Sequence, residues 1–590
     1  MSRSVLSLVA ATAAVATATA LPALAAPATF DRLLNADKEP QNWLMAQQNY
    51  SGWRHSGLDQ INRGNVANLK LAFIASIGGR STGGTLAGRE EATPLVNDGI
   101  MYVTDSWARV MAFNVGDATK GAVPLWRFDP KITKSRTQRG VAQLNDTVYI
   151  GTNDTRIVAL NRNTGEVLFD KQAAAPPDPQ WGTPSAKTQG FTSAPVTLRT
   201  KGGKELVLQG ESTGGQSGTI SWVGAWDAKT GELAWRFFTV PKPGEPGSET
   251  WKDNHNAWKI GGAGVWSIGS FDPDLNIVVN GTGDAFPSYQ PEFRPGDNLY
   301  AASVIANDVD TGKLTWYFQE TPNEQWDFDS PNTKLLVTVN GRKQVAEFAR
   351  NGFFYQLDRG TGAFIRADQY TTEVNWTKGI DPKTGKPVDY DPAGGVQAYA
   401  GLGSRNAKPG QRTCPGTRGP GFYPPTYDPD LAKVFAAGAE TCSLGTRITT
   451  PMDPAKNWVA QNTCCTETAN PGGKVGQGPN QGVKATIWAF DLTKGSTARA
   501  WIAETPNESG LLGTKSGLLF TGEHDGSFSA YDKGDLKRLW TFRLGAGICA
   551  PPISYAVNSR QYVAVVAGCS ANTDASALVQ PSAFIAFFAL

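Results

Sequence analysis

The chain has 590 residues, with 55 Lys and Arg against 53 Asp and Glu, so its formal net charge is only +2. This near balance gives no electrostatic case for binding to nucleic acid or to a membrane surface. The 65 Gly, 37 Pro and 18 Trp suit many short strands and turns rather than long amphipathic helices.

The first segment of the chain is typical of a targeting signal. Arg3 is followed by an apolar run from Val5 to Leu21 and then by Ala23-Leu24-Ala25, a small-x-small cleavage site. We expect cleavage after Ala25, which gives a signal peptide of residues 1–25 and an exported chain. The run is short and rich in Ala and Thr, which disfavours a membrane anchor, and no later stretch is long and apolar enough to span a bilayer.

A short phrase recurs along the chain: an apolar residue, Asp or Asn, a turn that ends in Gly, and then an aromatic residue. The copies, three clear and four weaker, are Ala225–Trp235, Ala306–Trp316, Ala159–Phe169, Ala112–Trp126, Gln356–Phe364, Ala489–Trp501 and Ala530–Trp540. Each copy is typical of a strand, a tight turn and a returning strand. Repeats of roughly 40 to 50 residues indicate a propeller or a solenoid. Seven copies, with one blade closed by the two chain ends, predict an all-β, eight-bladed β-propeller that forms one domain over residues 26–590.

The six cysteines are candidates for disulfide bonds because the chain is expected to be exported. The simplest pairing joins them in chain order: Cys414 to Cys442, Cys464 to Cys465, and Cys549 to Cys569. Bridges from the adjacent pair to distant cysteines carry equal weight, because six cysteines allow fifteen connectivities. The chain has no Cys-x-x-Cys-His motif for covalent haem and only three histidines, which disfavours a histidine-based zinc or iron centre.

Acidic and amide side chains near Gly-rich turns are the candidate site, and the segment Trp326-Asp327-Phe328-Asp329 is the most distinctive. In a strand, residues i and i+2 share a face, so we expect Asp327 and Asp329 to point at one site. Two close carboxylates repel each other unless a cation or a proton lies between them. A hard cation such as calcium would relieve that repulsion, whereas the alternative is a pair of solvated turn acids.

Further motifs extend over nearly the whole chain. They include Trp43, Tyr50-Ser51-Gly52-Trp53-Arg54, Gln60-Ile61-Asn62, Asn65-Val66, Glu91-Ala92-Thr93-Pro94-Leu95, Arg139-Gly140, Gly261-Gly262-Ala263-Gly264-Val265-Trp266, Phe271-Asp272-Pro273-Asp274-Leu275-Asn276, Arg294-Pro295-Gly296-Asp297-Asn298-Leu299-Tyr300, Glu320-Thr321-Pro322 and Arg350-Asn351-Gly352. With these motifs the chain resembles the quinoprotein alcohol dehydrogenases, periplasmic eight-bladed propellers that bind pyrroloquinoline quinone (PQQ) and a metal ion. The resemblance implies a central funnel that holds both cofactors.

The resemblance also implies a role for each matching residue. Asp327 falls on the catalytic base that accepts the alcohol proton, and Arg350 on the guanidinium that contacts the reactive carbonyl edge of the quinone. Trp266 matches the indole under the cofactor plane. The remaining cofactor contacts fall on Glu91, Arg139, Thr192, Thr213, Gly214 and Gly215. The metal ligands fall on Gln216, Asp284, Asp327 and Asp329.

The metal positions depart from the family pattern. Gln216 and Asp284 stand where the family has Glu and Asn, so one carboxylate is lost and another gained, which supports a retained cation. Asp329 is the extra acid that lanthanide-using relatives carry, and a trivalent ion would favour it. We expect Ca²⁺, with a lanthanide as the alternative.

A second departure concerns the cover of the cofactor. Thr133 and Lys134 stand at the positions of the vicinal disulfide that covers the cofactor face opposite the tryptophan in the family. The adjacent cysteines Cys464 and Cys465 are candidates either for the same cover, reached from another blade, or for an unrelated loop staple.

Two loop replacements concern the substrate. Gly421-Phe422-Tyr423 replaces an expected Asn, and Asn507-Glu508-Ser509-Gly510 replaces a bulkier aromatic segment. We expect a more open substrate side and a bulky secondary alcohol, for example the 3-hydroxyl of the trichothecene deoxynivalenol. Sorbose and other sugar alcohols, or a primary alcohol, are alternatives. Because the chain has no haem motif, we expect electrons to pass to a separate acceptor such as a periplasmic cytochrome c.

Two other classes of function compete with this one. A propeller hydrolase would use the two neighbouring acids as a carboxylate pair, and a non-catalytic propeller would act as a scaffold of the cell envelope. Neither class gives Glu91, Arg139, Trp266 and Arg350 a reason to occur together.

Overall fold

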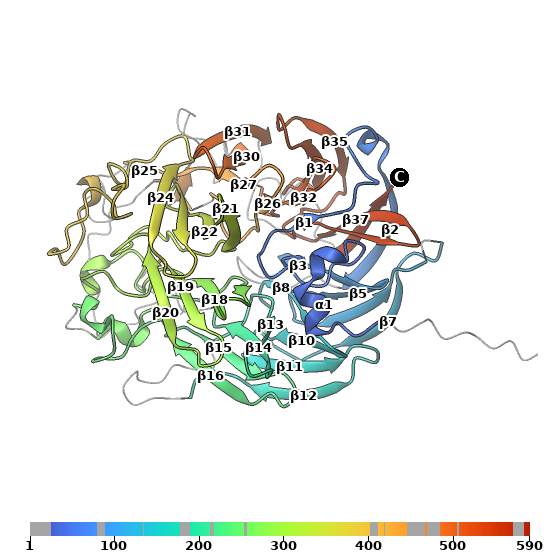
Figure 1. Ribbon diagram of the computed structural model, residues 1–590, viewed down its shortest axis with the longest axis horizontal. Coiled ribbons are helices and arrows are strands. Elements are labelled where there is room, and N and C mark those ends of the chain that lie inside the picture. Colours follow the sequence, from blue (N-terminus) through green and yellow to red (C-terminus); the bar gives the residue numbers. More distant parts are fainter. Residues whose placement is uncertain are drawn as a thin grey trace, which may run out of the picture.

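The computed structural model describes residues 25–78, 89–117, 119–133, 135–176, 189–212, 218–252, 256–401, 411–417, 419–444, 466–468, 484–503, 507–569 and 583–590, and the structural statements below concern these residues. Within them, eight sheets stand in a ring around a common centre (Figure 1). The all-β, eight-bladed propeller predicted from the repeats is therefore confirmed.

Each blade is a sheet of four strands, and one blade has a fifth strand, β1. The blades are β4–β7 (Leu95–Asn97, Ile100–Thr104, Val110–Asn114, Val123–Phe128), β9–β12 (Ala142–Leu144, Thr147–Gly151, Arg156–Asn161, Val167–Gln172), β13–β16 (Val196–Arg199, Glu205–Gly210, Trp222–Asp227, Leu233–Phe238), β17–β20 (Ser270–Asp272, Ile277–Gly281, Ser303–Asp308, Leu314–Gln319), β21–β24 (Leu335–Val339, Arg342–Phe348, Phe353–Asp358, Phe364–Gln369), β26-β27-β30-β31 (Thr426–Asp428, Lys433–Glu440, Lys484–Asp491, Ser496–Ala503), β1-β32-β33-β34-β35 (His55–Ser56, Leu512–Thr514, Leu518–Gly522, Ser527–Asp532, Arg538–Arg543) and β36-β37-β38-β2 (Ile553–Val557, Arg560–Ala567, Ala583–Ala589, Lys70–Gly78).

The remaining elements are short. A parallel pair joins β3 (Glu90–Thr93) to β8 (Gln138–Gly140), and a small sheet is formed by β25 (Arg412–Thr413), β28 (Cys442–Leu444) and β29 (Thr466–Thr468). The helical segments are α1 (Phe30–Leu34) and the 3₁₀ turns η1–η6 (Ala36–Lys38, Val66–Asn68, Ser248–Thr250, Ala257–Ile260, Pro291–Phe293 and Tyr399–Gly401). No helix in the described residues is long and apolar enough to cross a membrane.

At four blade boundaries the recurring aromatic residue is a tryptophan that joins one blade to the next. Trp235 on β16 donates its indole N–H to the carbonyl oxygen of Val309 in the following blade, at 2.8 Å. A Cβ atom on Gly312 would lie only 2.4 Å from the indole ring, and Gly312 has a φ of +73°, so only glycine fits this turn. Three further tryptophans repeat the indole hydrogen bond across blade boundaries, namely Trp126, Trp316 and Trp540.

The ring is closed by pairing the two ends of the chain. Strand β2, near the start, runs antiparallel to β38, the last strand, and completes a blade with β36 and β37 (Figure 1). A largely buried apolar core continues through this blade and its neighbours. The predicted closure of one blade by both chain ends is therefore confirmed.

Candidate active site

Three carboxylates converge where the loops of two neighbouring blades meet. Asp284 follows β18, whereas Asp327 and Asp329 lie in the loop between β20 and β21. Oxygens of the three side chains all lie within 4.8 Å of one another, and the backbone N–H of Asp284 donates to Oδ1 of Asp329 at 2.5 Å. The two acids predicted from spacing therefore meet, and Asp284 joins them.

The local backbone differs from the strand that the spacing predicted. Residues 327–330 are not in a strand, and Asp327 adopts a left-handed conformation with a φ of +68°. The strand prediction was wrong because the loop makes a tight turn in which Glu324 accepts the N–H groups of Trp326 and Phe328. Aspartate tolerates this left-handed conformation better than most residues, so it fits such a turn.

The electrostatics of the cluster favour a bound cation. Burial raises the pKa of Asp284 well above its usual range, and the charges of Asp329 and Asp327 raise it further. Burial also raises the pKa of Asp329, against the opposing charge of Arg350, and raises the pKa of nearby Glu324 to about 7. Because every ligand atom here is a carboxylate oxygen, the donor set fits a hard cation, which would relieve the repulsion.

Arg350 and Trp266 adjoin these acids. The Nη1 atom of Arg350 lies 3.3 Å from Oδ2 of Asp329 and 3.6 Å from Oδ1 of Asp327. The indole N–H of Trp266 donates to the same Oδ2 atom of Asp329 at 3.1 Å. The guanidinium of Arg350 also lies 5.4 Å from the centre of the Trp266 ring. A cation-binding group, a positive charge and a broad aromatic face therefore share one site.

Trp266 also adjoins a second polar group. Arg139 lies 5.1 Å from the Trp266 ring centre, donates to Oγ1 of Thr192 at 2.8 Å and forms an ion pair of 2.9 Å with Glu91. Burial lowers the pKa of Arg139 and raises that of Glu91, while the charge of each opposes the shift of the other. Glu91, Arg139 and Thr192 therefore lie near Trp266, as the resemblance to the family implied.

Phe422 is a site residue that the sequence reasoning missed. Its ring centre lies 5.8 Å from that of Trp266, and the guanidinium of Arg139 lies 4.6 Å from it. Phe422 also lines a cavity with Glu91 and Arg139. The sequence showed only that an expected Asn was replaced there. The expected opening of the substrate side stays a prediction, but the loop does place an aromatic ring over the site.

A buried ionic network extends from Glu91 away from the carboxylate cluster. Arg89 contacts both Glu91 and Glu508, and His524 lies 3.3 Å from Glu508 and 3.3 Å from Sγ of Cys549. Burial alone would lower the pKa of Arg89, but the two carboxylates raise it above its usual range. No motif pointed to this network, because its members come from segments far apart in the chain.

The disulfide predictions are confirmed where the structure describes them. Cys414 is bonded to Cys442 and Cys549 to Cys569. The predicted pair Cys464 and Cys465 lies outside the described residues, as does Lys134. The same holds for four expected site residues, Thr213, Gly214, Gly215 and Gln216.

Comparisons with known proteins agree with this geometry. Residues 43–367 and 482–563 match the family model "PQQ: Glucose/ethanol/alcohol dehydrogenase, beta-propeller domain". The dehydrogenase subunit of alcohol dehydrogenase (quinone) from Gluconacetobacter polyoxogenes is 34% identical, and the match covers 92% of this chain and 73% of that one. Quinohemoprotein alcohol dehydrogenase ADH IIB from Pseudomonas putida is 33% identical, over 93% of this chain and 77% of its own. Among solved structures, a europium-containing methanol dehydrogenase superposes with a TM-score of 0.79 at 27% identity, covering 95% of this chain and all of the other.

Proposed function

The chain belongs to the PQQ-dependent alcohol dehydrogenases, and on this premise we propose that it oxidises a bulky secondary alcohol to the ketone in the periplasm. The family implies PQQ and a metal ion as cofactors. The observation that carries the proposal is the convergence of Asp284, Asp327 and Asp329 beside Arg350 and Trp266.

In the proposed reaction, Asp327 is the base. PQQ, when bound, would supply an electrophilic carbonyl carbon as the acceptor of the hydride from the alcohol carbon. The Asp327 carboxylate takes the hydroxyl proton, so the C–H and O–H bonds both break and the ketone is released. Arg350, 3.6 Å from Asp327, places positive charge where negative charge develops during reduction. Two electrons then pass to a separate acceptor.

Each cofactor has a proposed set of binding residues. Trp266 would stack under the quinone plane, and the two arginines beside its ring support binding of an anionic ring system there. The proposed quinone-binding residues are Glu91, Arg139, Thr192, Thr213, Gly214, Gly215, Trp266 and Arg350. The proposed metal ligands are Gln216, Asp284, Asp327 and Asp329. We propose Ca²⁺, with a lanthanide as the alternative that Asp329 and the similarity to a europium-containing enzyme support.

The proposed substrate rests on the walls of the site. The family's vicinal disulfide is replaced by Thr133 and Lys134, and a bulkier aromatic segment by residues 507–510. These changes support a bulky secondary alcohol, such as the 3-hydroxyl of deoxynivalenol, over small primary alcohols. Sorbose or another sugar alcohol is the alternative within the family. The discrimination rests on a few pocket contacts worth about 1–3 kcal/mol each.

The location and the electron acceptor are proposed from the signal peptide. A signal peptide of residues 1–25 would direct the domain of residues 26–590 to the periplasm. A cytochrome c or a similar carrier there would accept the electrons. The relatives that are named dehydrogenase subunits or quinohemoproteins support an external or appended haem partner.

Reconstitution tests the proposal. The metal-stripped protein would receive PQQ with Ca²⁺, PQQ with La³⁺, or each component alone, and a dye acceptor would report turnover of small and bulky alcohols. We expect activity only with quinone and metal together, and the highest kcat/KM with a bulky secondary alcohol. A preference for ethanol would overturn the substrate proposal. Absence of quinone binding under every condition would favour the non-catalytic scaffold.

A further inference from the structure

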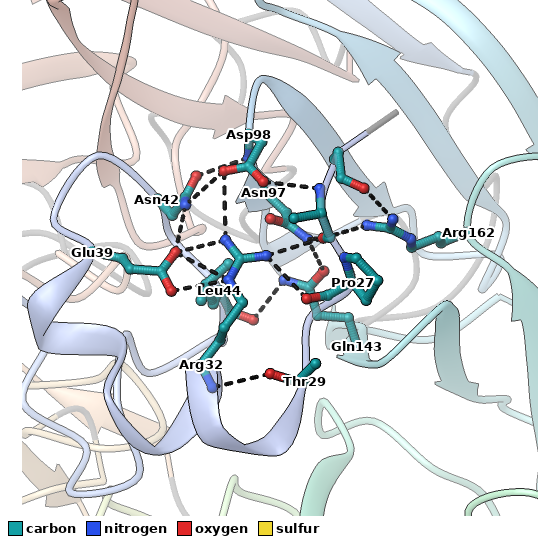
Figure 2. A network of polar contacts seen from close by, with 12 residues as sticks. Pro27, Thr29, Arg32, Glu39, Asn42, Leu44, Asn97, Asp98, Gln143 and Arg162 are labelled. Carbon is teal, nitrogen blue, oxygen red and sulfur yellow. Dashed lines mark hydrogen bonds and ion pairs between the residues drawn. The ribbon is translucent and has the colours of Figure 1, made fainter. Parts of the chain in front are cut away.

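The peptide group of Ala26 is held at the surface by an unusual number of polar side chains. Its N–H donates to Oδ2 of Asp98 at 3.0 Å. Its carbonyl oxygen accepts from Arg32 Nη1 at 3.0 Å, Asn97 Nδ2 at 2.9 Å and Arg162 Nη1 at 2.7 Å. Arg32 lies on α1, Asn97 ends β4 and Asp98 follows it, and Arg162 directly follows β11 (Figure 2). Residues of two blades and of the first helix therefore all form hydrogen bonds with the exposed residue Ala26.

The charges around Ala26 leave one carboxylate in excess. Arg32 pairs with Glu39 at 2.6 Å and approaches Asp98 at 3.5 Å, while Arg162 pairs with Asp146 at 2.9 Å. Two guanidinium groups thus face three carboxylates. A single added positive charge at the nitrogen of Ala26 would balance the cluster. That nitrogen already lies at hydrogen-bond distance from the carboxylate of Asp98.

We propose that Asp98 is the receptor for a new α-ammonium group at Ala26, formed when the peptide bond between Ala25 and Ala26 is cut. This proposal rests on the signal-peptide processing proposed above. Hydrolysis adds one water: Ala25 keeps a carboxylate and leaves with the leader, and the amine of Ala26 takes up a proton. The hydrogen bond from a neutral peptide N–H to the Asp98 carboxylate then becomes an ion pair between two charged groups, which is stronger.

The contacts single out this peptide bond over its neighbours. A cut before Ala25 would leave the nitrogen of Ala26 as an uncharged peptide donor. A cut after Ala26 would remove the carbonyl oxygen on which Arg32, Asn97 and Arg162 converge, leaving these three donors without it. After the proposed cut, Arg162 loses its contact with the Ala25 carbonyl but keeps Ala26 and Asp146.

Cleavage between Ala25 and Ala26 would have a structural consequence. The segment after Ala26 pairs with the second blade through Ala28 and Asn145, at 3.0 and 2.8 Å, so the anchor at Ala26 fixes the start of that pairing. A chain that still carries its leader lacks the charge that completes the cluster. The first helix of the uncut chain should therefore open locally more often than that of the processed chain.

The first experiment identifies the N-terminal residue of the exported protein by intact mass and peptide sequencing. We expect Ala26. A chain that begins at Ala25 or Pro27 would overturn the proposal, whatever the enzymatic activity of the protein. Because this readout involves neither quinone nor alcohol, it is independent of the proposed function.

The second experiment measures the ion pair by hydrogen exchange of the amides in residues 28–35. It compares the processed protein with a form that retains Gly-Ser before Ala26, each with Asp98 and with Asp98→Asn. We expect exchange about tenfold faster in the extended form, and a tenfold acceleration by Asp98→Asn in the processed form only. Asp146→Asn is the matched control, because it removes the same charge without a contact to Ala26. Equal effects of Asp98→Asn in both forms would overturn the proposal. If Asp98→Asn fails to fold, the comparison of the processed and the extended form, both with Asp98, tests the proposal: equal exchange rates would overturn it.

Discussion

Replacing Asp329 with asparagine should change which metal ion the site prefers. Asp329 contacts Arg350 and Trp266 and lies within 4.8 Å of the other two carboxylates. The substitution Asp329→Asn keeps the shape and one oxygen of the side chain but removes one negative charge. The loss of attraction scales with the charge of the ion. The binding free energy lost by a trivalent ion should therefore be about one and a half times that lost by a divalent ion.

The magnitude follows from simple electrostatics. An oxygen ligand lies about 2.4 Å from a calcium-sized ion. At an effective dielectric constant of about 20, one negative charge at that distance attracts each unit of cation charge by about 7 kcal/mol. If the amide oxygen and water recover four fifths of this, Ca²⁺ loses about 3 kcal/mol and La³⁺ about 4 kcal/mol. These losses correspond to about 100-fold and 1000-fold in Kd.

The assay is equilibrium binding of Ca²⁺ and La³⁺ to the metal-stripped protein without quinone. Asp274→Asn is the control, because Asp274 is an exposed acid paired with Lys343 on the surface. We expect the preference for La³⁺ over Ca²⁺ to fall by about tenfold in Asp329→Asn and to stay unchanged in the control. An equal loss for both ions would refute the charge argument, and no loss for either would place Asp329 outside the ligand set.

Three further predictions concern the base, the aromatic cover and the pH dependence of stability. Asp327→Ala should leave the fold intact and lower kcat/KM by about 10²–10⁴-fold; near-normal turnover of the reconstituted enzyme would rule it out as the base. Phe422→Ala should weaken quinone binding by about tenfold, measured as quenching of tryptophan fluorescence, whereas Phe422→Tyr should bind normally; equal binding by both variants would contradict a covering role. Burial alone would raise the pKa of Asp428, but His55 and Lys533 hold it well below its usual range. Its contribution to stability is therefore complete above the ordinary pKa of about 4 and is lost as the pH falls through the lower folded value. Asp428→Asn should cost about 3 kcal/mol in denaturant unfolding at pH 7, and a difference from the native chain that did not shrink in acid would contradict this.

The repeats predicted the architecture because their physics is local. In the copy at Ala225–Trp235, Oδ1 of Asp227 accepts the N–H groups of Lys229 and Thr230, which closes the turn within a few residues. Four of the copies end in a tryptophan that donates its indole N–H to a carbonyl oxygen across the blade boundary, namely Trp126, Trp235, Trp316 and Trp540. A pattern made of a short-range turn and one regularly spaced aromatic residue can be detected in the sequence without knowledge of the distant contacts.

The site was predicted less completely because its members meet only in three dimensions. Asp327 and Asp329 were found from their spacing, although the strand that justified the spacing is absent and a turn with positive φ brings them together. Phe422 was seen only as a departure from a pattern. The contact of its ring with Arg139 depends on a loop path that no local rule defines.

The network around Arg89, Glu508 and His524 shows the same limit more strongly. Glu508 belongs to a segment that sequence reasoning treated as an absent aromatic wall, yet its carboxylate is buried against a guanidinium more than 400 positions away in the chain. Buried ion pairs of this kind carry no periodicity. Only the ring geometry, which returns the end of the chain to its beginning, places such residues side by side.

That return of the chain has a consequence for synthesis. Strand β2 stays an open edge until β38, which ends at Ala589, is available to pair with it. The last blade borders the first, and β37 also packs near β3, which carries Glu91. A nascent chain from which β38 has not yet emerged therefore lacks a finished ring. The ring around the site can therefore close only once β38 is available, so a chain that lacks β38 should have no rigid site rather than a slightly weakened one.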